Sequence, residues 1–369
     1  MKIKSVKATP VRVPVTRLGV MSGAVRTHAE RTIVQVVADN GKIGIGETRG
    51  VFSASIINDR FSNLLEGLPV ESKIVARDKC IRKNLDYGFP EQLLELNAFA
   101  GVEMALWDLE GKEADLPLYQ LLGGAVRAVA PFVAYAYNVD HRTGSSEAKI
   151  PEIMGALAEE RVALTGASMF EFKIGVHSLA CDIDTVMAVR ESLSADVDIR
   201  IDANMGFDLR SASSLAEKIS AANIANFEEP VAHLCEMAIL RREYKIPIST
   251  HCTDFDALKP YPQIDSVVPD LHLLGGIAAT KRFCAKACSF NRSVWLRSMW
   301  ELGISWAAMC HLGIACPELE RPAQSLIDWI SDDLIIGDPW LVRNGGVCLP
   351  DLPGLGVQLD YNALRKFSV

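Results

Sequence analysis

Three apolar segments of this chain each end near a side chain that can bind a metal ion. Asp202, Glu228 and His251 stand at these positions, each following a segment that reads as a buried strand. Carboxylate oxygens and imidazole nitrogens are common ligands of divalent cations. A single carboxylate at such a point is more often a loop residue or a helix cap. Three possible ligands at the ends of successive strands predict a metal site formed by Asp202, Glu228 and His251.

The third ligand influences which metal such a site would prefer. Oxygen ligands suit Mg²⁺, which is our first choice of cofactor, whereas the imidazole of His251 shifts the preference towards Mn²⁺, Fe²⁺ or Zn²⁺. Asp254 is the alternative third ligand. Asn204 follows Asp202 by two residues, and we expect it to donate a hydrogen bond to a bound water or to substrate.

The elements that carry these side chains alternate short apolar segments with helical ones from about residue 129 onward. The apolar segments are residues 131–137, 169–174, 197–201, 225–228, 246–249, 265–268 and 293–296. Such alternation indicates repeated strand–helix units, and seven or eight of them favour a closed parallel barrel. A doubly wound sheet is disfavoured because no glycine-rich phosphate turn follows the first strand. In barrels of this kind the chemistry lies at the carboxyl ends of the strands.

The first part of the chain has a different pattern. Residues 3–13 and 32–37 alternate apolar and polar side chains, residues 42–47 continue the pattern, and residues 16–28 read as a loop. From about residue 54 to 122 the period becomes helical. Strands followed by helices predict a small α+β domain.

Charge and composition limit the partners. The chain of 369 residues has 38 basic and 46 acidic side chains, a net charge of −8, which argues against nucleic acid as a partner. Nine scattered cysteines indicate reduced thiols, and neither a signal peptide nor a membrane span is apparent. We expect a cytoplasmic protein that binds a small molecule, contacts no membrane and forms a homo-oligomer.

Residues 98–112, AFAGVEMALWDLEGK, continuing to residues 117–123, PLYQLLG, resemble the signature of the mandelate racemase and muconate lactonizing branch of the enolase superfamily. Residues 350–356, PDLPGLG, resemble the closing segment of the same family. The resemblance implies a modified (β/α)₇β barrel over residues 126–340. It also implies an α+β capping domain over residues 1–125, completed by about 340–369. A divalent metal would stabilise the charge formed when the proton α to a carboxylate is removed.

Two shorter segments narrow the resemblance. Residues 246–255, IPISTHCTDF, and residues 270–272, DLH, are similar to the glucarate dehydratase subgroup. The resemblance to that subgroup implies that the substrate is an acid sugar and that the reaction eliminates water.

The family's Lys-x-Lys on the second barrel strand aligns with residues 170–175, FEFKIG. Lys173 retains the second lysine, and the resemblance makes it the base, since a nearby cation favours the neutral form of a lysine. Glu171 replaces the first lysine. Residues two apart on a strand share a face, so both point into the barrel, and a purely structural Glu171–Lys173 pair is the alternative.

On the opposite side the family places a His on the seventh strand, supported by an Asp on the sixth. Residues 296–305, LRSMWELGIS, put Arg297 at the position of the His and Glu301 where the subgroup often has a second one, while Asp270 remains. Arginine does not deprotonate at ordinary pH, so an Asp270–Arg297 pair would bind an anion. If the alignment is shifted, Glu301 faces the site instead.

Arg17, Thr48 and Arg49, together with Arg26, fall in the two capping-domain loops that set specificity in the family. We expect them to contact a distal carboxylate or the hydroxyl groups of the substrate, with a solvated surface as the alternative. His272 and Trp300 are expected to pack at the rim of the pocket rather than to react.

Together these features predict a metal-dependent hydro-lyase that removes water from an acid sugar. Lys173 would take the α-proton, and Glu171 or Glu301 would protonate the leaving hydroxyl. A racemase or epimerase is the second hypothesis, disfavoured because inversion normally needs bases on two faces. A barrel that has lost turnover and acts as a binding protein is the third.

Overall fold

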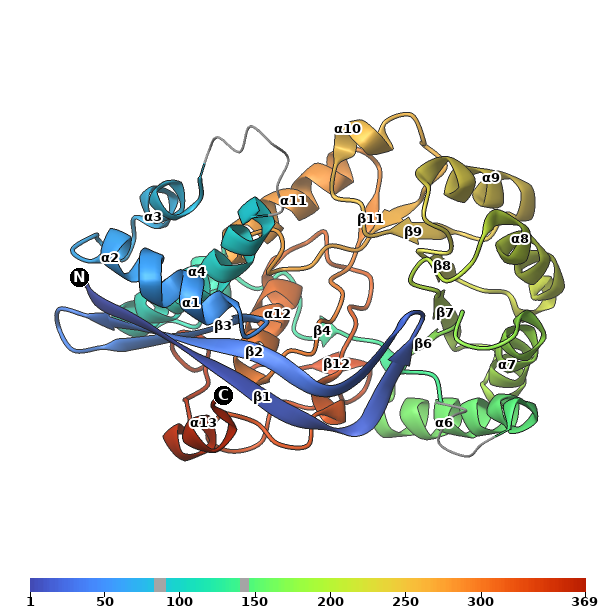
Figure 1. Cartoon of the computed structure of the whole chain (residues 1–369), viewed down its shortest axis with the longest axis horizontal. Helices are drawn as coiled ribbons and strands as arrows, with labels where there is room; N and C mark the ends of the chain where they lie inside the picture. The colour runs from blue at the N-terminus through green and yellow to red at the C-terminus, as the bar shows by residue number, and fades with distance from the viewer. Residues whose placement is uncertain (83–90, 140–145) are drawn as a thin grey trace.

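The structure is a computed structural model, and it describes residues 1–82, 91–139 and 146–369. A three-stranded antiparallel sheet with its helices lies beside a barrel of parallel strands surrounded by helices (Figure 1). The predicted modified (β/α)₇β barrel with an α+β capping domain is confirmed. The boundaries near residues 125 and 340 stay predictions.

The capping sheet is built on a long hairpin that reaches over the barrel (Figure 1). Its strands are β1 (Ile3–Met21), β2 (Ala24–Ala38) and β3 (Ile43–Arg49), in the order β1-β2-β3. The prediction of a loop over residues 16–28 is wrong, because β1 and β2 pair as far as Met21 and Ala24. A register shift between Pro14 and Gly19 absorbs the extra residues of β1 and obscures the alternation, so the strands continue beyond it.

Helices cover one side of this sheet. They are α1 (Ser53–Ile56), the π-helix η1 (Ile57–Phe61), α2 (Ser62–Leu65), α3 (Lys73–Cys80), α4 (Glu91–Ala114) and α5 (Leu118–Leu121). The helix α4 carries most of the family signature and packs directly on β3. A Cβ atom at Gly44 or Gly46 would overlap the carbonyl oxygen of Ala105 or Gly101, so these glycines permit the close approach.

Asp108 of the signature joins three parts of the chain. Its buried carboxylate accepts hydrogen bonds from the backbone N–H of Ile45 at 2.8 Å and of Leu355 at 2.9 Å, and it pairs with Lys112 at 2.6 Å. The closing segment therefore contacts α4 of the capping domain. Further on, α13 (Tyr361–Phe367) packs under the hairpin, where Gln35 donates to the hydroxyl of Tyr361 at 2.9 Å.

The barrel contains seven parallel strands among the described residues, in the order β11-β10-β9-β8-β7-β6-β5. They are β5 (Ala134–Ala136), β6 (Met169–Lys173), β7 (Asp198–Asp202), β8 (Asn226–Glu228), β9 (Ile248–Thr250), β10 (Ser266–Val267) and β11 (Ser293–Val294). Each lies within or beside a segment predicted from the sequence. A short antiparallel pair, β4 (Ala130–Pro131) with β12 (Gly346–Val347), lies at the amino end of β5.

An irregular segment closes the barrel between β11 and β5. Its Gln324 donates its backbone N–H to the carbonyl of Leu296 at 2.9 Å, and the backbone N–H of Val133 donates to the carbonyl of Ala323 at 3.0 Å. Residues 323–325 thus take the place of an eighth strand.

Each barrel strand is followed by a helix on the outside (Figure 1). These are α6 (Ile150–Thr165), α7 (Leu179–Ser192), α8 (Leu209–Lys218), α9 (Leu234–Tyr244), α10 (Phe255–Leu258), α11 (Ile277–Ser289) and α12 (Gly303–Ala315), with the 3₁₀ turns η3 (Glu147–Lys149), η4 (Ser220–Ala222) and η5 (Ile327–Trp329). All residues of α12 are buried, because it lies between the barrel and the capping domain. No helix in the described part of the chain is long and apolar enough to cross a membrane.

His311 links α12 to α5 and to the closing segment, and its environment predicts a pH effect on stability. Its Nδ1 accepts from the backbone N–H of Tyr119 at 3.1 Å, and its Nε2 donates to the carbonyl of Leu355 at 3.2 Å. A proton on Nδ1 would remove the acceptor that Tyr119 uses. Burial accordingly lowers the pKa of His311 from 6.5 to about 4.

Between pH 6.5 and pH 4 the unfolded chain takes up a proton that the folded chain excludes, so His311 lowers the free energy of unfolding as the pH falls. One proton over this range corresponds to about 3 kcal/mol at most. Urea unfolding at pH 7 and pH 4.5 should show a smaller acid-induced loss for His311→Asn than for the parent. His233→Asn removes an exposed histidine and is the control. An equal loss in parent and His311→Asn would contradict the assignment.

Candidate active site

Three neighbouring strands bring Lys173, Asp202 and Glu228 into one row. Lys173 is the register partner of Asp202, and Asp202 is the partner of Glu228. Register partners in a parallel sheet point to the same face. Each of the three ends its strand, and each is at most 5% exposed. The row therefore lies at the carboxyl end of the barrel, facing its interior.

His251 completes a group that fits a divalent metal. Asp202, Glu228 and His251 each offer one ligand atom, and these atoms all lie within 4.8 Å of one another. Two buried carboxylates this close repel unless a cation lies between them. The Oδ1 atom of Asn204 is buried beside them and has no hydrogen-bond partner within the described residues. Carboxylate and imidazole donors at this spacing suit Mg²⁺ or Mn²⁺.

Protein groups partly balance the charge of this group. Lys173 forms an ion pair with Asp202, and His251 Nε2 lies 2.9 Å from Glu228 Oε1. Burial raises the pKa of Asp202, against the opposing effect of Lys173. Burial also favours the neutral form of Glu228, but the hydrogen bond from His251 and nearby positive charges bring its pKa below the ordinary value. At least one of the two carboxylates is thus held ready to bind a cation.

Asn204 lies against Asp202. Its backbone N–H donates to Asp202 Oδ1 at 2.8 Å, and its side-chain amide donates to Oδ2 at 3.4 Å. Its φ of 46° is in the left-handed region, which asparagine tolerates better than most residues. Asn204 therefore orients Asp202, and its free Oδ1 can accept a hydrogen bond from substrate or water.

Asp254, the alternative third ligand, points elsewhere. It is exposed and caps α10, accepting from the backbone N–H groups of Asp256 and Ala257 at 2.9 Å and 3.3 Å. His251 is the imidazole that meets the two carboxylates.

Glu171 lies one row deeper than Lys173. Its register partner is Arg200, and the two form a buried ion pair at 2.8 Å, with Arg200 also stacked on Trp295 at 3.8 Å. Burial raises the pKa of Glu171, whereas Arg200 opposes the rise. The alternative of a Glu171–Lys173 pair is wrong, because each binds a different partner on β7.

Gln324, in the irregular segment that closes the barrel, was not anticipated from the sequence. Its side-chain amide donates to Glu171 Oε1 at 2.5 Å and to Glu228 Oε1 at 3.1 Å, joining the two rows. The segment 323–325 has no strand pattern of its own. The sequence shows seven strand segments where a barrel needs eight. That missing strand is the one signal that could have indicated a barrel-closing segment around Gln324.

Asp270 and Arg297 lie on the opposite side of the barrel mouth from Lys173, after β10 and β11. Asp270 Oδ1 accepts from the backbone N–H of His272 at 2.6 Å and from His272 Nδ1 at 3.1 Å. Asp270 Oδ2 lies 4.0 Å from Arg297 Nε. Burial alone would raise the pKa of Asp270, but the hydrogen bonds from His272 and the charge of Arg297 hold it well below its usual value. Asp270 is thus a carboxylate facing an arginine.

His272 does not face the barrel mouth. Its Nε2 lies 2.9 Å from Arg31 Nη2 and 3.0 Å from Ser305 Oγ, and the residue is fully buried. Arg31 in turn pairs with Glu47 at 2.5 Å. Capping strands β2 and β3 therefore hold the Asp270–His272 segment in place through a buried polar network that the sequence did not indicate.

The loop from residue 297 to 302 is fixed by the same network. Arg31 Nη1 donates to the carbonyl of Met299 at 3.0 Å, and Glu47 accepts from the backbone N–H of Leu302 at 2.9 Å. Glu301 is buried and accepts from Ser298 Oγ at 2.5 Å and from the backbone N–H of Met299 at 2.7 Å. Burial and the charges of Asp202 and Glu301 raise the pKa of Tyr137.

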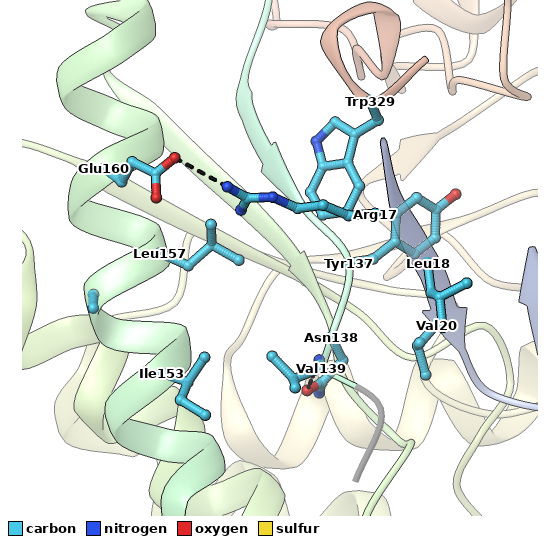
Figure 2. Close-up of a pocket in the computed structure, with 11 residues that line it drawn as sticks. Arg17, Leu18, Val20, Tyr137, Asn138, Val139, Ile153, Leu157, Glu160 and Trp329 are labelled. Carbon is cyan, nitrogen blue, oxygen red and sulfur yellow. Dashed lines mark hydrogen bonds and ion pairs between the residues drawn. The ribbon is translucent and has the colours of Figure 1, made fainter. Parts of the chain in front are cut away.

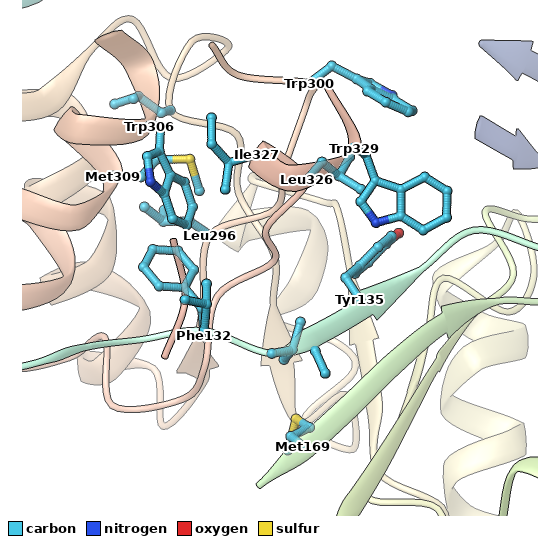
Figure 3. Packing of buried hydrophobic residues seen from close by; sticks show 14 of the residues in the cluster. Phe132, Tyr135, Met169, Leu296, Trp300, Trp306, Met309, Leu326, Ile327 and Trp329 are labelled. Atoms are coloured by element: carbon cyan, nitrogen blue, oxygen red, sulfur yellow. The ribbon is translucent and has the colours of Figure 1, made fainter. Parts of the chain in front are cut away.

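Aromatic rings pack together beside this loop, and Tyr135, Trp300 and Trp329 are among them (Figure 3). Trp300 stacks on Tyr137 with ring centroids 5.0 Å apart, and Trp329 meets Tyr137 edge-on at 5.5 Å. Lys173 Nζ lies 6.0 Å from the ring centroids of both Tyr135 and Tyr137. Trp300 is buried as expected for a packing residue. These rings shield Lys173 from solvent on this side.

Arg17 lies outside the metal group, in an apolar pocket of about 570 Å³ between the hairpin and α6 (Figure 2). There it pairs with Glu160 at 3.3 Å, and both side chains are more than half exposed. Tyr137 lines this pocket and also lies beside Lys173. Because none of Asp202, Glu228 and His251 lines it, we regard the pocket as adjoining the site rather than as the site itself.

Thr48 and Arg49 differ in whether their side chains can reach a substrate. Thr48 is fully buried and donates its hydroxyl to the backbone carbonyl of Asn97, so it does not reach a substrate and we leave it out of the site. Arg49, at the end of β3, is the register partner of Arg31 and is partly exposed.

The fold and this site define a metal-dependent barrel enzyme of the lyase or isomerase type. Residues 3–123 match the model of the mandelate racemase / muconate lactonizing enzyme N-terminal domain, and residues 154–363 match that of the enolase C-terminal domain-like family. The chain belongs to the mandelate racemase and muconate lactonizing branch of the enolase superfamily, as the signature predicted.

Individual relatives carry different activities. A probable glucarate dehydratase from Streptomyces coelicolor is 26% identical over 392 residues, covering 99% of this chain and 90% of that protein. A chloromuconate cycloisomerase from Pseudomonas putida is also 26% identical over 390 residues, covering 100% and 99%. Equal identity to a dehydratase and a cycloisomerase does not decide the reaction.

Solved structures agree on the architecture. An enolase from Streptomyces coelicolor has a TM-score of 0.90 at 30% identity, covering 100% of this chain and 96% of that one. An enolase from Pseudomonas fluorescens, solved with bound magnesium, potassium and tartrate, has a TM-score of 0.85 at 26% identity, covering 99% and 92%.

Proposed function

We propose that this chain is an acid-sugar dehydratase that removes the proton α to a carboxylate and eliminates water. The observation that supports the proposal most strongly is the asymmetry of the barrel mouth. Lys173 stands on one side of Asp202, Glu228 and His251, whereas Arg297 stands on the other. Arginine stays protonated, so a base is present on one face alone. A single base suits elimination better than inversion.

Asp202, Glu228 and His251 would hold the divalent metal, with Mg²⁺ as the first choice because a neighbour of this fold was solved with magnesium. When bound, the metal would supply positive charge to a substrate carboxylate and so stabilise the charge that develops on its oxygens. Asn204 keeps Asp202 oriented and offers its free Oδ1 to a substrate hydroxyl.

Lys173 is the residue that accepts the α-proton on its Nζ atom. The carbon–oxygen bond to the β-hydroxyl then breaks, and the oxygen leaves as water after receiving a proton. Glu301 is chosen over Glu171 for that transfer, because Glu171 is held one row deeper by Arg200 and Gln324. The resulting enol converts to a 2-keto-3-deoxy acid.

The test is a library of hexaric, pentaric, hexonic and pentonic acids assayed with Mg²⁺ and with Mn²⁺ for 2-keto-3-deoxy acids. We expect at least one acid to give this product. Absence of the product from every acid would refute the dehydratase proposal.

A racemase or epimerase is the second candidate, favoured by the match to the mandelate racemase / muconate lactonizing enzyme family. The same assays in D₂O separate the two, because an epimerase would return substrate with deuterium at an inverted α-carbon and without loss of water. Under the dehydratase proposal, recovered substrate keeps its configuration.

A further inference from the structure

Gln324 lies between two buried carboxylates of the barrel. Its Nε2 atom is 2.5 Å from Glu171 Oε1, and it is 3.1 Å and 3.3 Å from Glu228 Oε1 and Oε2. The nitrogen of a side-chain amide carries two hydrogen atoms. One is directed to Glu171, and the other is shared by the two oxygens of Glu228. Because both oxygens are contacted, the Glu228 carboxylate is restrained from rotating about its terminal bond.

The orientation of the Gln324 amide is set by a further contact. The backbone N–H of Ser298 donates to Gln324 Oε1 at 3.0 Å. A reversed amide would place its oxygen against two carboxylates and its NH₂ group against a backbone N–H, so neither end would find a partner. Gln324 is 3% exposed, so solvent offers little alternative. Gln324 Nε2 must therefore face Glu171 and Glu228.

Arg200 holds this arrangement from behind. Its Nη1 atom donates to Glu171 Oε2 at 2.8 Å and to the backbone carbonyl of Pro322 at 3.2 Å. Since Pro322 is two residues before Gln324, the contacts form a closed ring that runs from Arg200 through Glu171 to Gln324 and back along the chain. Arg200 and Glu171 are at most 1% exposed. The ring fixes the side chain of Gln324 although its segment is not a regular strand.

A neutral donor suits this place beside a metal ligand. Glu171 and Glu228 would repel each other if no donor lay between them. Gln324 donates to both without adding a charge, whereas a lysine or arginine would compete with a metal ion for the charge of Glu228. Glu171 has both of its oxygens engaged, Oε1 by Gln324 and Oε2 by Arg200. These contacts suit a supporting role for Glu171 better than proton transfer to a substrate.

We propose that Gln324, held by Glu171 and Arg200, is a positioning residue for the metal ligand Glu228. Glu171, one of the two carboxyl groups that the sequence suggested for proton transfer, thus serves the metal site instead. Replacing a group that hydrogen-bonds to a metal ligand commonly costs about 10- to 100-fold in metal affinity. The inference rests on the proposed function for its metal site, but metal binding can be measured without substrate or turnover.

The experiment is a calorimetric titration of full-length, metal-free protein with Mn²⁺ and, separately, with Mg²⁺. Gln324→Met keeps the length of the side chain and removes both N–H donors. We expect the affinity for each metal to fall about 10-fold or more, because Glu228 is no longer held in its metal-binding orientation. Gln324→Asn keeps the amide but is one methylene shorter and should lose affinity in the same direction. The test therefore does not depend on the folding of one variant.

A paired replacement tests whether Glu171 acts through Gln324. Glu171→Met with Arg200→Met leaves the net charge unchanged, and exchange of a buried ion pair for apolar side chains often preserves a fold. We expect a smaller loss of metal affinity than in Gln324→Met, because Ser298 still orients the amide. Adding Gln324→Met to the pair should give no greater loss than Gln324→Met alone, since residues that act through one another are not additive.

Two controls separate positioning from stability. Arg161→Met breaks a buried ion pair with Asp328, which joins α6 to η5, so it should lower the thermal unfolding temperature and leave metal affinity unchanged. Gln35→Met removes a glutamine that donates to the hydroxyl of Tyr361 in another part of the molecule and should also leave it unchanged. Parental metal affinity in Gln324→Met, losses that multiply in the combined variant, or an equal loss in Arg161→Met would overturn the inference.

The two proposals fail in different ways. Parental metal affinity in Gln324→Met, together with formation of 2-keto-3-deoxy acids by the parent, would refute the role of Gln324 and leave the dehydratase standing. Weakened metal binding in Gln324→Met, with no elimination from any acid by the parent, would refute the dehydratase and leave the role of Gln324 standing.

Discussion

Lys173→Met is expected to reduce the turnover number by about 10²- to 10⁴-fold, the contribution usual for a positioned general base. Lys173 is assigned as the base because Arg297 cannot accept a proton and Glu171 is bound to Arg200 one row deeper, while Glu301 is assigned the proton transfer to the leaving hydroxyl. Methionine has a similar length and fills the space beside Tyr135 and Tyr137. The fold should therefore be preserved while the proton acceptor is lost.

The measurement is the initial rate of 2-keto-3-deoxy product formation, together with exchange of the α-proton with solvent deuterium. Both should fall together, because the same atom accepts the proton in each. Lys218→Met, at an exposed position at the end of α8, is the matched control and should leave both rates unchanged. Metal titration of Lys173→Met shows whether the loss arises from the base or from an altered Asp202. Retained exchange with normal metal binding would assign the base elsewhere.

Glu228→Gln is expected to weaken divalent metal binding by about 100-fold or more and to lower turnover by about 10³-fold at limiting metal. Glu228 is fully buried and meets His251 at 2.9 Å, so its carboxylate is positioned before any metal arrives. Glutamine keeps the shape and can retain contacts to its neighbours, but it removes the negative charge that a hard cation requires. Chelation of the parent protein should abolish turnover in the same way, and added Mg²⁺ or Mn²⁺ should restore it.

Asp254→Asn provides the control for this charge change. Asp254 lies three residues after His251 but caps α10, and asparagine caps a helix nearly as well as aspartate. Metal affinity, measured by calorimetry with Mg²⁺ and Mn²⁺, should be unchanged in Asp254→Asn. A loss of affinity there equal to that of Glu228→Gln would place the third ligand at Asp254 instead of His251.

The same titrations give the ratio of Mg²⁺ affinity to Mn²⁺ affinity in the parent protein. An imidazole ligand lowers the preference for Mg²⁺, so tighter binding of Mn²⁺ than of Mg²⁺ would indicate that His251 is a metal ligand.

Local pattern alone was sufficient for much of this protein. The spacing of apolar segments predicted the parallel barrel because each buried strand must be apolar and each covering helix must present an apolar stripe. The positions of Asp202 and Glu228 followed as well, since the last residue of a buried strand necessarily lies at the carboxyl end of the barrel. The signature around Asp108 identified the family because it joins β3, α4 and the closing segment by contacts that few other side chains could make.

Tertiary structure alone decided which partner each charged group takes. Glu171 and Lys173 are two residues apart and their pairing was the alternative left open by the sequence, but register places Arg200 beside the first and Asp202 beside the second. Gln324 joins the site through a segment with no strand pattern of its own.

The same applies across the two domains. Thr48 and Arg49 are adjacent in the sequence, but Thr48 is buried and binds a backbone carbonyl, whereas Arg49 is partly exposed. Sequence patterns report the periodicity of burial along one segment, whereas hydrogen bonds and ion pairs depend on which segments, often more than 200 residues apart as with Arg31 and His272, the fold brings together. The sequence by itself therefore determined the barrel, the family and the strand ends that carry the metal group. The folded chain decided that Glu171 pairs with Arg200 and that Gln324 joins Glu171 to Glu228.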